Sequence, residues 1–197
     1  MGAIEEILKM AKLNNGTITT AMVVEAGFSR GNIKYLVDKG LLEKSARGIY
    51  VLPDVWDDEI YNAQFRFKKG IYSCETALFL LDLTDRTPNQ YCMTFPIGYN
   101  LTNPKNESIR CTQCKEEIYD LGIIEVTTPG GNIVKVYNME RTLCDILRTH
   151  SNVDIQIVTE AFKRYAKIRN KNLNLLSEYA RKLRVEKRVR AYLEVLL

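Results

Sequence analysis

The stretch from Thr19 to Leu52 constrains the fold of this chain most, because helical and strand patterns follow one another there within a short distance. A threonine at position 19 or 20 can cap a first short helix, since its hydroxyl accepts a hydrogen bond from an N–H group at the helix start. The apolar residues of this helix form one face, and they are Met22, Val23 and Ala26. The stretch is therefore predicted to begin with a short amphipathic helix.

A second helix follows after a turn that contains Gly27, a residue free to take the positive φ angle of a helix end. Ser29 can cap this second helix, and Gly40 ends it. Its apolar residues lie at i, i+3 and i+4 spacing, and they are Ile33, Leu36 and Val37. Two helices joined by a short glycine-containing turn are typical of the helix-turn-helix motif, whose second helix lies in the major groove of DNA.

A β-hairpin is predicted directly after the second helix. Its strands are residues 42–44 and 49–52, and its turn is residues 45–48, with Arg47 at the tip. A hairpin in this position makes the helix-turn-helix a winged helix.

The winged helix is predicted to fill residues 1–53. A helix over Ala3–Leu13 packs across the back of the two helices, and residues 17–18 form a short strand that pairs with the hairpin. Pro53 ends this unit because it has no N–H group for further strand pairing. Residues 54–197 are then left for a second domain.

The solvent side of the second helix and the hairpin carry groups that suit DNA. Lysine and arginine bind phosphates, and polar side chains on a helix in the major groove reach base edges. The predicted DNA-binding residues are Ser29, Arg30, Asn32, Lys34, Tyr35, Lys44 and Arg47. The same order of elements also occurs as a small packing unit without a ligand. The basic hairpin tip and the polar helix face favour double-stranded DNA as the partner.

Residues 54–197 predict a mixed α/β domain that ends in a helical array. A helix within residues 54–69 and another capped by Ser73 come first. The predicted strands are residues 91–95, 108–112, 122–128 and 133–137, and residues 100–106 are predicted as a polar loop. The predicted C-terminal helices are residues 140–147, 154–169, 173–183 and 185–197. The chain as a whole is therefore predicted to be α+β, with an N-terminal winged helix-turn-helix.

The C-terminal helices carry most of the positive charge. Residues 160–197 have a net charge of +7, whereas residues 56–159 have a net charge of −4. Bases on surface helices often serve solubility alone, but this density favours an anionic partner, either DNA beside the recognition site or an acidic protein surface. The predicted basic patch consists of Lys163, Arg164, Lys167, Arg181, Arg184, Lys187 and Arg188.

Composition limits the location of the chain and its metal chemistry. No apolar run approaches the ~20 residues that span a membrane, so no membrane contact and a cytoplasmic location are expected. Five cysteines in a chain of this kind indicate free thiols. Cys111 and Cys114 form a CxxC pair, but a structural zinc site needs two more ligands and the only histidine is His150. Neither a metal nor a cofactor is predicted.

A mixed sheet behind a DNA-binding unit could also be a nuclease, which gathers carboxylates around a metal ion. Glu125 lies in a predicted strand with Asp120 nearby, but the residue two positions after Glu125 is Thr127 rather than lysine. No further carboxylate or base completes such a site, and no GxxxxGK[ST] or GxGxxG motif is present. We therefore predict no catalytic residue and no enzymatic activity.

Three segments carry a resemblance to a known family. They are RGIYVLP (Arg47–Pro53), IYSCETALFLLDLTDRTP (Ile71–Pro88) and VYNMERTLCDILR (Val136–Arg148). With these segments in this order, nearly the whole chain resembles the AbiE-type antitoxins of bacterial abortive-infection toxin–antitoxin pairs. The most specific parts are the patterns S-x-E-T-A-L-x-L and E-R-T-L-C-D-I-L.

This resemblance implies an antitoxin that represses its own operon by binding inverted repeats in DNA. It implies a partner toxin of the nucleotidyltransferase type, which the domain after the winged helix counters without a stable complex. A monomer in solution that binds DNA cooperatively is compatible with this interpretation. The alternative is a winged-helix DNA-binding protein with a C-terminal nuclease or ligand-sensing domain. Metal-dependent cleavage of plasmid DNA would distinguish the two.

Overall fold

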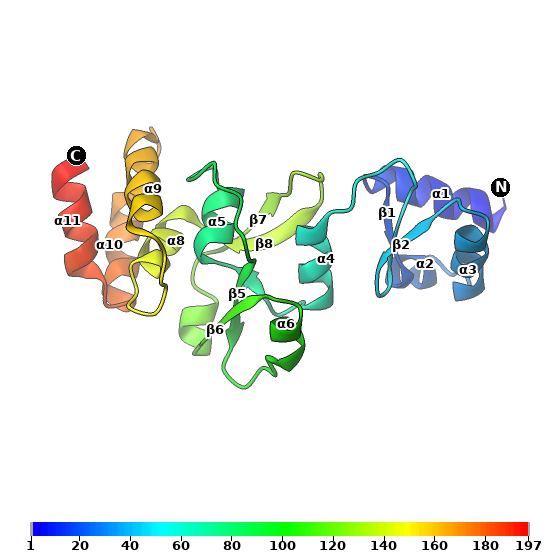
Figure 1. The fold of residues 1–197 in the computed structure, drawn as a ribbon, viewed down its shortest axis with the longest axis horizontal. Helices are drawn as coiled ribbons and strands as arrows, with labels where there is room; N and C mark the ends of the chain where they lie inside the picture. The colour runs from blue at the N-terminus through cyan, green and yellow to red at the C-terminus, as the bar shows by residue number, and fades with distance from the viewer. Residues whose placement is uncertain (1, 197) are drawn as a thin grey trace. The chain divides into compact units, whose positions relative to one another are not determined.

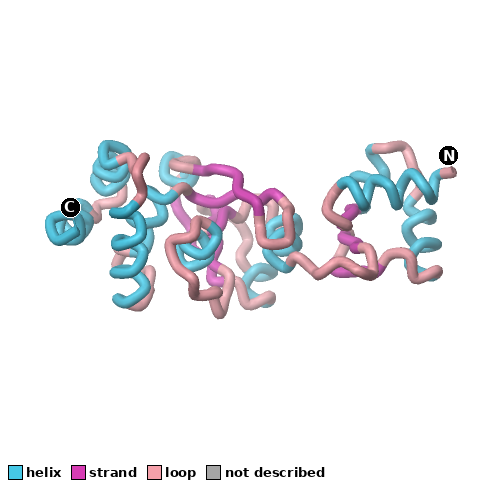
Figure 2. The backbone as a smooth tube through the Cα atoms, turned by 90° about the horizontal axis from the view of Figure 1, so that it is seen from above, coloured by secondary structure: helices cyan, strands magenta, loops and turns pink. Residues whose placement is uncertain are grey.

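The structure is a computed structural model that describes residues 2–196, and the chain divides into two compact units (Figure 1 and Figure 2). The first unit consists of Met1–Arg66 together with Thr127–Val134, and the second of Phe67–Val126 together with Lys135–Leu197. The first unit is thus larger than the predicted domain of residues 1–53, because it takes in α4 and the tip of a later hairpin.

The first unit contains a winged helix, as the sequence predicted. The helices and strands of the first unit before the later hairpin are α1 (Ala3–Leu13), β1 (Thr17–Thr19), α2 (Thr20–Glu25), α3 (Arg30–Asp38), β2 (Glu43–Ala46), β3 (Ile49–Val51) and α4 (Glu59–Arg66). The strands form an antiparallel sheet in the order β1-β3-β2, so the short strand before α2 pairs with the hairpin that follows α3. Figure 1 shows α1, α2 and α3 gathered around this small sheet.

Side-chain caps begin both helices of the helix-turn-helix. The hydroxyl of Thr19 accepts a hydrogen bond from the Met22 N–H (3.2 Å), and that of Ser29 accepts one from the Gly31 N–H (3.2 Å). Between the helices Gly27 has φ +83°, as the predicted turn requires. The predicted apolar face of α2 was wrong at one position, because Ala26 follows the last turn of the helix and is exposed.

The winged helix has an apolar core of its own. The buried residues of this core are Ile7, Ala11, Ile18, Val23, Ile33, Leu36 and Leu42. Each large aliphatic side chain removed from water contributes about 1.5–3 kcal/mol. Because these residues come from α1, β1, α2, α3 and the residue before β2, the spacing seen in the sequence is sufficient to assemble this core.

The second unit is built on a mixed five-stranded sheet in the order β6-β5-β4-β8-β7. The strands are β4 (Ile71–Tyr72), β5 (Cys92–Pro96), β6 (Arg110–Cys114), β7 (Ile123–Thr127) and β8 (Ile133–Tyr137). β4 pairs antiparallel with β5 and parallel with β8, while β5 and β6 are parallel. Although β4 has only two residues, it lies at the centre of the sheet, and the sequence did not reveal it.

Three short helices lie between these strands, α5 (Cys74–Leu80), α6 (Thr102–Asn106) and α7 (Glu116–Tyr119). The predicted loop over residues 100–106 was wrong, because α6 lies there. Pro104 fits in its first turn, where N–H groups have no partner within the helix. Ser73 precedes α5 as predicted, but its side chain does not cap the helix and instead accepts a hydrogen bond from the Thr94 hydroxyl (3.0 Å).

The chain ends in the predicted helical array. Its helices are α8 (Met139–Ile146), α9 (Ile155–Lys167), α10 (Leu173–Lys182) and α11 (Glu186–Leu196). The last helix was predicted to include Leu197, which lies outside the described residues. Side chains of Asn138, Asp154 and Asn172 cap α8, α9 and α10 by accepting hydrogen bonds from N–H groups of the first turn. The fold class is therefore α+β, as predicted.

Candidate nucleic-acid interface

Helix α3 separates an apolar side from a polar side. Ile33 and Leu36 are buried in the core of the winged helix, whereas Arg30 and Lys34 are exposed, as is half of Tyr35. Arg30 and Lys34 lie four residues apart and so project from the same face of the helix. This face offers two cations and an aromatic hydroxyl to the solvent.

Other predicted residues of α3 have different surroundings. Asn32 is half-buried and lies at the margin of the exposed face. Ser29 is exposed, but its hydroxyl already accepts the hydrogen bond that caps α3. The structure adds Lys39, which sequence reasoning missed: its Nζ lies 5.8 Å from the centre of the Tyr35 ring. It also places the exposed carboxylate of Asp38 on this helix, which disfavours phosphate nearby.

The wing supplies the remaining predicted cations. Lys44 is exposed on β2, and Arg47 is exposed in the tight turn between β2 and β3. The turn is completed by Gly48, whose φ of +81° only glycine takes without strain. The hairpin is tighter than predicted, because β2 runs to Ala46 and leaves two residues in the turn.

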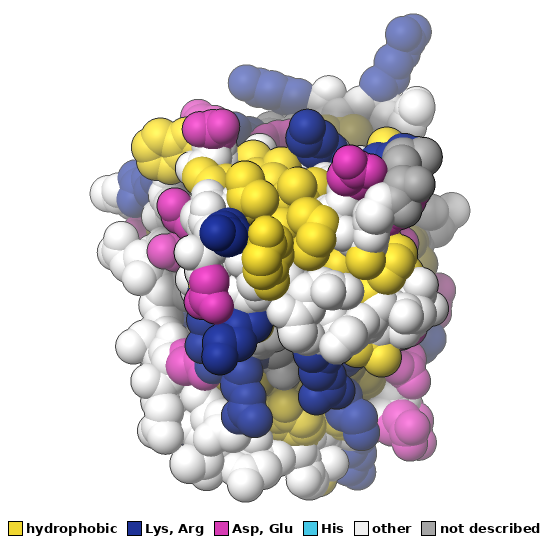
Figure 3. Space-filling model, turned by 90° about the vertical axis from the view of Figure 1, so that its right-hand side faces the viewer, with side chains coloured by type: hydrophobic (Ala, Val, Ile, Leu, Met, Phe, Trp, Pro, Cys, Tyr) yellow, Lys and Arg dark blue, Asp and Glu magenta, His cyan; other side chains and the backbone are white. Residues whose placement is uncertain are grey.

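Figure 3 views the molecule from the end at which α1, α2 and α3 lie in Figure 1. On this face Lys and Arg side chains gather beside a patch of hydrophobic side chains. Among the large apolar residues of the first unit, Val24, Tyr35 and Leu41 are between 42% and 50% exposed. This gathering of cations is local, since residues 1–55 as a whole carry a net charge of only +1.

The predicted basic patch divides into exposed and engaged residues. Lys163, Lys167, Arg181, Arg184, Lys187 and Arg188 are exposed, whereas Arg164 is half-buried. Arg164 is paired with Asp85 and Glu160, and Arg188 donates a hydrogen bond to the Leu147 carbonyl. Six of the seven predicted bases are therefore exposed, and two of the seven, Arg164 and Arg188, are held by contacts within the second unit.

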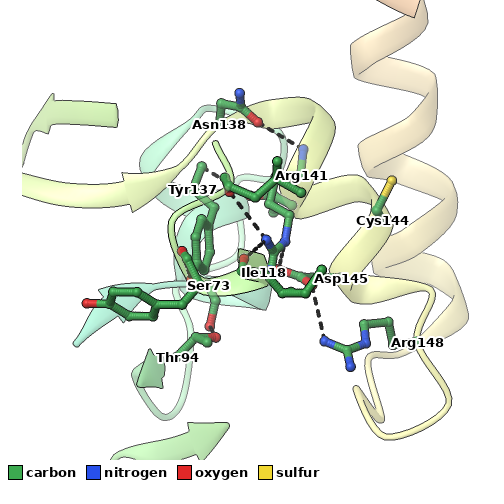
Figure 4. A network of polar contacts seen from close by, with 12 residues as sticks. Ser73, Thr94, Ile118, Tyr137, Asn138, Arg141, Cys144, Asp145 and Arg148 are labelled. Atoms are coloured by element: carbon green, nitrogen blue, oxygen red, sulfur yellow. Dashed lines mark hydrogen bonds and ion pairs between the residues drawn. The ribbon is translucent and has the colours of Figure 1, made fainter. Parts of the chain in front are cut away.

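The family-like pattern around Arg141 lies in the interior of the second unit. Arg141 is fully buried, and its Nε donates to Asp145 at 2.9 Å while its Nη1 donates to the backbone carbonyls of Ile118 and Leu121. Figure 4 shows its guanidinium next to the Tyr137 ring, whose centre lies 4.4 Å from Cζ. Burial raises the pKa of Asp145, and the charge of Arg141 opposes this rise.

Other polar residues of the two patterns also hold the second unit together. Thr76 accepts a hydrogen bond from the Cys92 N–H (2.9 Å), and Thr142 donates one to the Tyr137 carbonyl (3.1 Å). Glu140 accepts hydrogen bonds from the Tyr165 hydroxyl and the Asn172 N–H. The segments that carry the resemblance thus serve the fold of the second unit.

One residue of these patterns, Glu75, reaches a cavity. It forms an ion pair with Arg110, and both residues line a polar cavity of about 600 Å³ together with Arg86, Asp154 and several amide side chains. Arg86 is itself held by Gln156. With two acids and two bases, the lining has no excess of either charge.

The cysteines have the properties of structural thiols. Burial raises the pKa of all five thiols, so they stay protonated at neutral pH. Cys111 and Cys114 lie three positions apart on β6, and side chains at an odd spacing leave opposite faces of a strand. Within residues 2–196, no group of three or more His, Cys, Asp or Glu side chains is arranged to hold a metal ion.

The carboxylates considered for a nuclease, Asp120 and Glu125, are both exposed. Across the described part of the chain, no helix is long and apolar enough to span a membrane.

Comparisons with known proteins found a family match for the N-terminal segment and a solved structure of similar fold. Residues 5–53 match the model of a family described as transcriptional regulator, AbiEi antitoxin. Among solved structures, that of the RV2827C protein from Mycobacterium tuberculosis is similar, with a TM-score of 0.57 and 14% identity over 90% of this chain and 71% of that chain. At this identity the likeness concerns the fold alone. A search of curated proteins found no significant match.

Proposed function

We propose that this chain is an AbiEi-type antitoxin that binds duplex DNA through α3 and the wing and thereby represses transcription of its own operon. Its N-terminal segment, residues 5–53, matches that family of transcriptional regulators. The observation that carries the proposal is the exposed polar face of α3 within this matched segment, opposite a face that is buried in the core.

In the proposed complex α3 enters the major groove with Arg30, Lys34 and Tyr35 towards the bases and phosphates. Lys44 and Arg47 of the wing contact the backbone beside the groove, which fixes the orientation of the unit but carries little sequence information. Two copies on an inverted repeat would each read one half-site, and the separation of the half-sites would match the helical repeat of DNA.

The test of this half of the proposal is binding of full-length variants to the DNA upstream of their own gene. Arg30→Ala and Lys34→Ala are expected to weaken binding. A lost base-edge contact costs about 1–3 kcal/mol and relaxes specificity, whereas a lost phosphate contact lowers the slope of affinity against salt by about 1. Fluorescence anisotropy at several salt concentrations measures both quantities.

Lys9→Ala and Lys12→Ala provide matched controls, because they remove the same charge from exposed positions of α1 rather than of α3. Both controls are expected to bind close to wild type. Wild-type affinity and salt dependence in both the Arg30 and Lys34 variants would remove α3 from the interface.

We further propose that the second unit neutralises a toxin of the nucleotidyltransferase type without a stable complex. The support is the resemblance of Ile71–Pro88 and Val136–Arg148 to the AbiE-type antitoxins, since both segments belong to this unit. The exposed bases of α9, α10 and α11 and of the connections after them are then available to an anionic partner. Co-expression with the product of the neighbouring gene, scored by growth, tests this half of the proposal.

A further inference from the structure

The wing is held to the chain segment that follows it by polar side chains. Strand β2 shifts its register against β3 between Lys44 and Ala46, which singles out Ser45 as the irregular residue. The Ser45 hydroxyl donates to a carboxylate oxygen of Asp57 at 2.5 Å. The Asn62 amide, from α4, donates to both the Ser45 oxygen and the same Asp57 oxygen at 2.5 Å.

Asp58, the residue after Asp57, is itself fixed by a buried set of hydrogen bonds. One of its carboxylate oxygens accepts from the Tyr61 N–H at 3.0 Å at the start of α4. The other accepts from the Thr128 hydroxyl (2.5 Å) and from the Asn132 amide (2.9 Å). Asp58, Thr128 and Asn132 are each at most 9% exposed. A buried carboxylate that accepts three hydrogen bonds is held firmly in one position, because loss of any donor leaves its buried charge less well compensated.

The tip of the β7–β8 hairpin fits closely against these residues. A Cβ atom at Gly130 would lie 2.6 Å from a carboxylate oxygen of Asp58, so only glycine fits there. On the other side of the tip, the Asn15 amide donates to the Gly131 carbonyl at 2.6 Å. Thr127–Val134 is therefore an integral part of the first unit, although it is distant in sequence.

From these contacts we infer that Asp57 and Asn62 are positioning residues for the wing, acting through Ser45, and that Asp58 and the hairpin tip keep them in place. Lys44 and Arg47, the two wing cations, lie on either side of Ser45 along the chain. A bulge changes the direction of the side chains next to it in the strand. The hydrogen bonds that fix Ser45 therefore set the direction of the Lys44 and Arg47 side chains. The inference rests on the proposed DNA-binding function and adds the residues that set the orientation of the wing.

Ser45→Ala is the decisive variant, because it removes the hydroxyl that contacts Asp57 and Asn62 without changing the charge of the protein. It loses both hydrogen bonds of the Ser45 hydroxyl, and in the full-length protein it is expected to weaken binding to the upstream DNA at least about five-fold. Ser45→Thr keeps the hydroxyl and is expected to restore wild-type binding. Asp57→Asn is less informative alone, since loss of a negative charge also favours DNA.

A double-mutant cycle separates positioning from general destabilisation. In the Ser45→Ala background, Arg47→Ala is expected to cost less than in wild type, because the cation is already misplaced. The cost of Arg30→Ala, on α3, is expected to be unchanged. Equal costs of Arg47→Ala in both backgrounds, or a parallel fall in the Arg30 contribution, would overturn the inference.

Hydrogen–deuterium exchange tests the same inference without DNA. Amides of residues 43–51 are expected to exchange several-fold faster in Ser45→Ala, while those of α3 keep their protection. Unchanged exchange in the wing would overturn the positioning role. Wild-type protein that fails to bind the upstream DNA would contradict the proposed function, and the exchange measurement would still decide whether these residues hold the wing.

Discussion

Arg141 illustrates how the surroundings of a residue decide its role. A fully buried guanidinium is costly unless it is paired, and here Asp145 and two backbone carbonyls accept its hydrogen bonds. On the opposite side of Asp145, Arg148 approaches within 3.7 Å, but its side chain remains 37% exposed (Figure 4). Two arginines next to one carboxylate are therefore expected to make very different contributions to stability.

Arg141→Met is expected to destabilise the protein by about 3–5 kcal/mol, because it leaves the Asp145 carboxylate buried without its main partner. Urea denaturation followed by circular dichroism measures the loss. Arg148→Met, the matched control, is expected to cost about 0–1 kcal/mol, as for an exposed ion pair. Comparable losses in the two variants would show that the Arg141–Asp145 pair does not stabilise the second unit in the way proposed.

Helix α9 contacts the segment after α5 through an ion pair. Arg164 donates hydrogen bonds to both carboxylate oxygens of Asp85, in the segment after α5, and also pairs with Glu160 one turn earlier in α9. The hydrogen bonds from Arg164 lower the pKa of Asp85 below its ordinary value. In the folded state this carboxyl therefore stays ionised at a lower pH than in the unfolded chain.

A lowered pKa in the folded state contributes stability above the pKa of the unfolded chain, and this stability is lost as the pH falls through the lowered value. Asp85→Asn is thus expected to lower the urea midpoint at neutral pH and to match wild type in acid. Glu117→Gln, at an exposed carboxyl of α7, serves as control and is expected to change little. A difference between Asp85→Asn and wild type that is the same at both pH values would contradict this account.

At the scale of the whole molecule, the predicted DNA-binding residues and the two family-like patterns lie in different compact units. The buried core of the winged helix lies between Ile7 and Leu42, and the partly buried residues packed against it lie between Ile4 and Leu52, so this part is expected to fold without the rest of the chain. The contacts of Asp57, Asp58 and the hairpin tip are lost when the chain is cut after residue 55.

A fragment of residues 1–55 is therefore expected to fold and to bind the upstream DNA, but several-fold more weakly than the full chain. It is also expected not to rescue cells that express the toxin. Circular dichroism, anisotropy and growth on co-expression measure the three outcomes. Full rescue by the fragment would place antitoxicity in the winged helix, and binding as tight as that of the full chain would leave no role for the hairpin tip in aiming the wing.

The sequence by itself determined the elements whose residues lie close together along the chain. Apolar spacing, caps and glycines predicted α1, α2, α3 and the wing, because these signals act between residues at most a few positions apart. The hairpin of β7 and β8 followed from the same local pattern. The polar side of α3 could be predicted for the same reason, because the apolar spacing shows which face is buried and the opposite face must then be exposed.

Tertiary structure alone decided the features that depend on distant partners. The two-residue strand β4 becomes central only through β5 and β8, and Thr127–Val134 belongs to the first unit, where it contacts Asn15 and Asp58. Likewise, Arg141 is buried and Arg164 is paired, although in sequence each is one arginine of an amphipathic helix. The periodicity of apolar residues in the sequence indicates which face of a helix or strand is buried. Which other element covers that face depends on packing between residues distant in sequence.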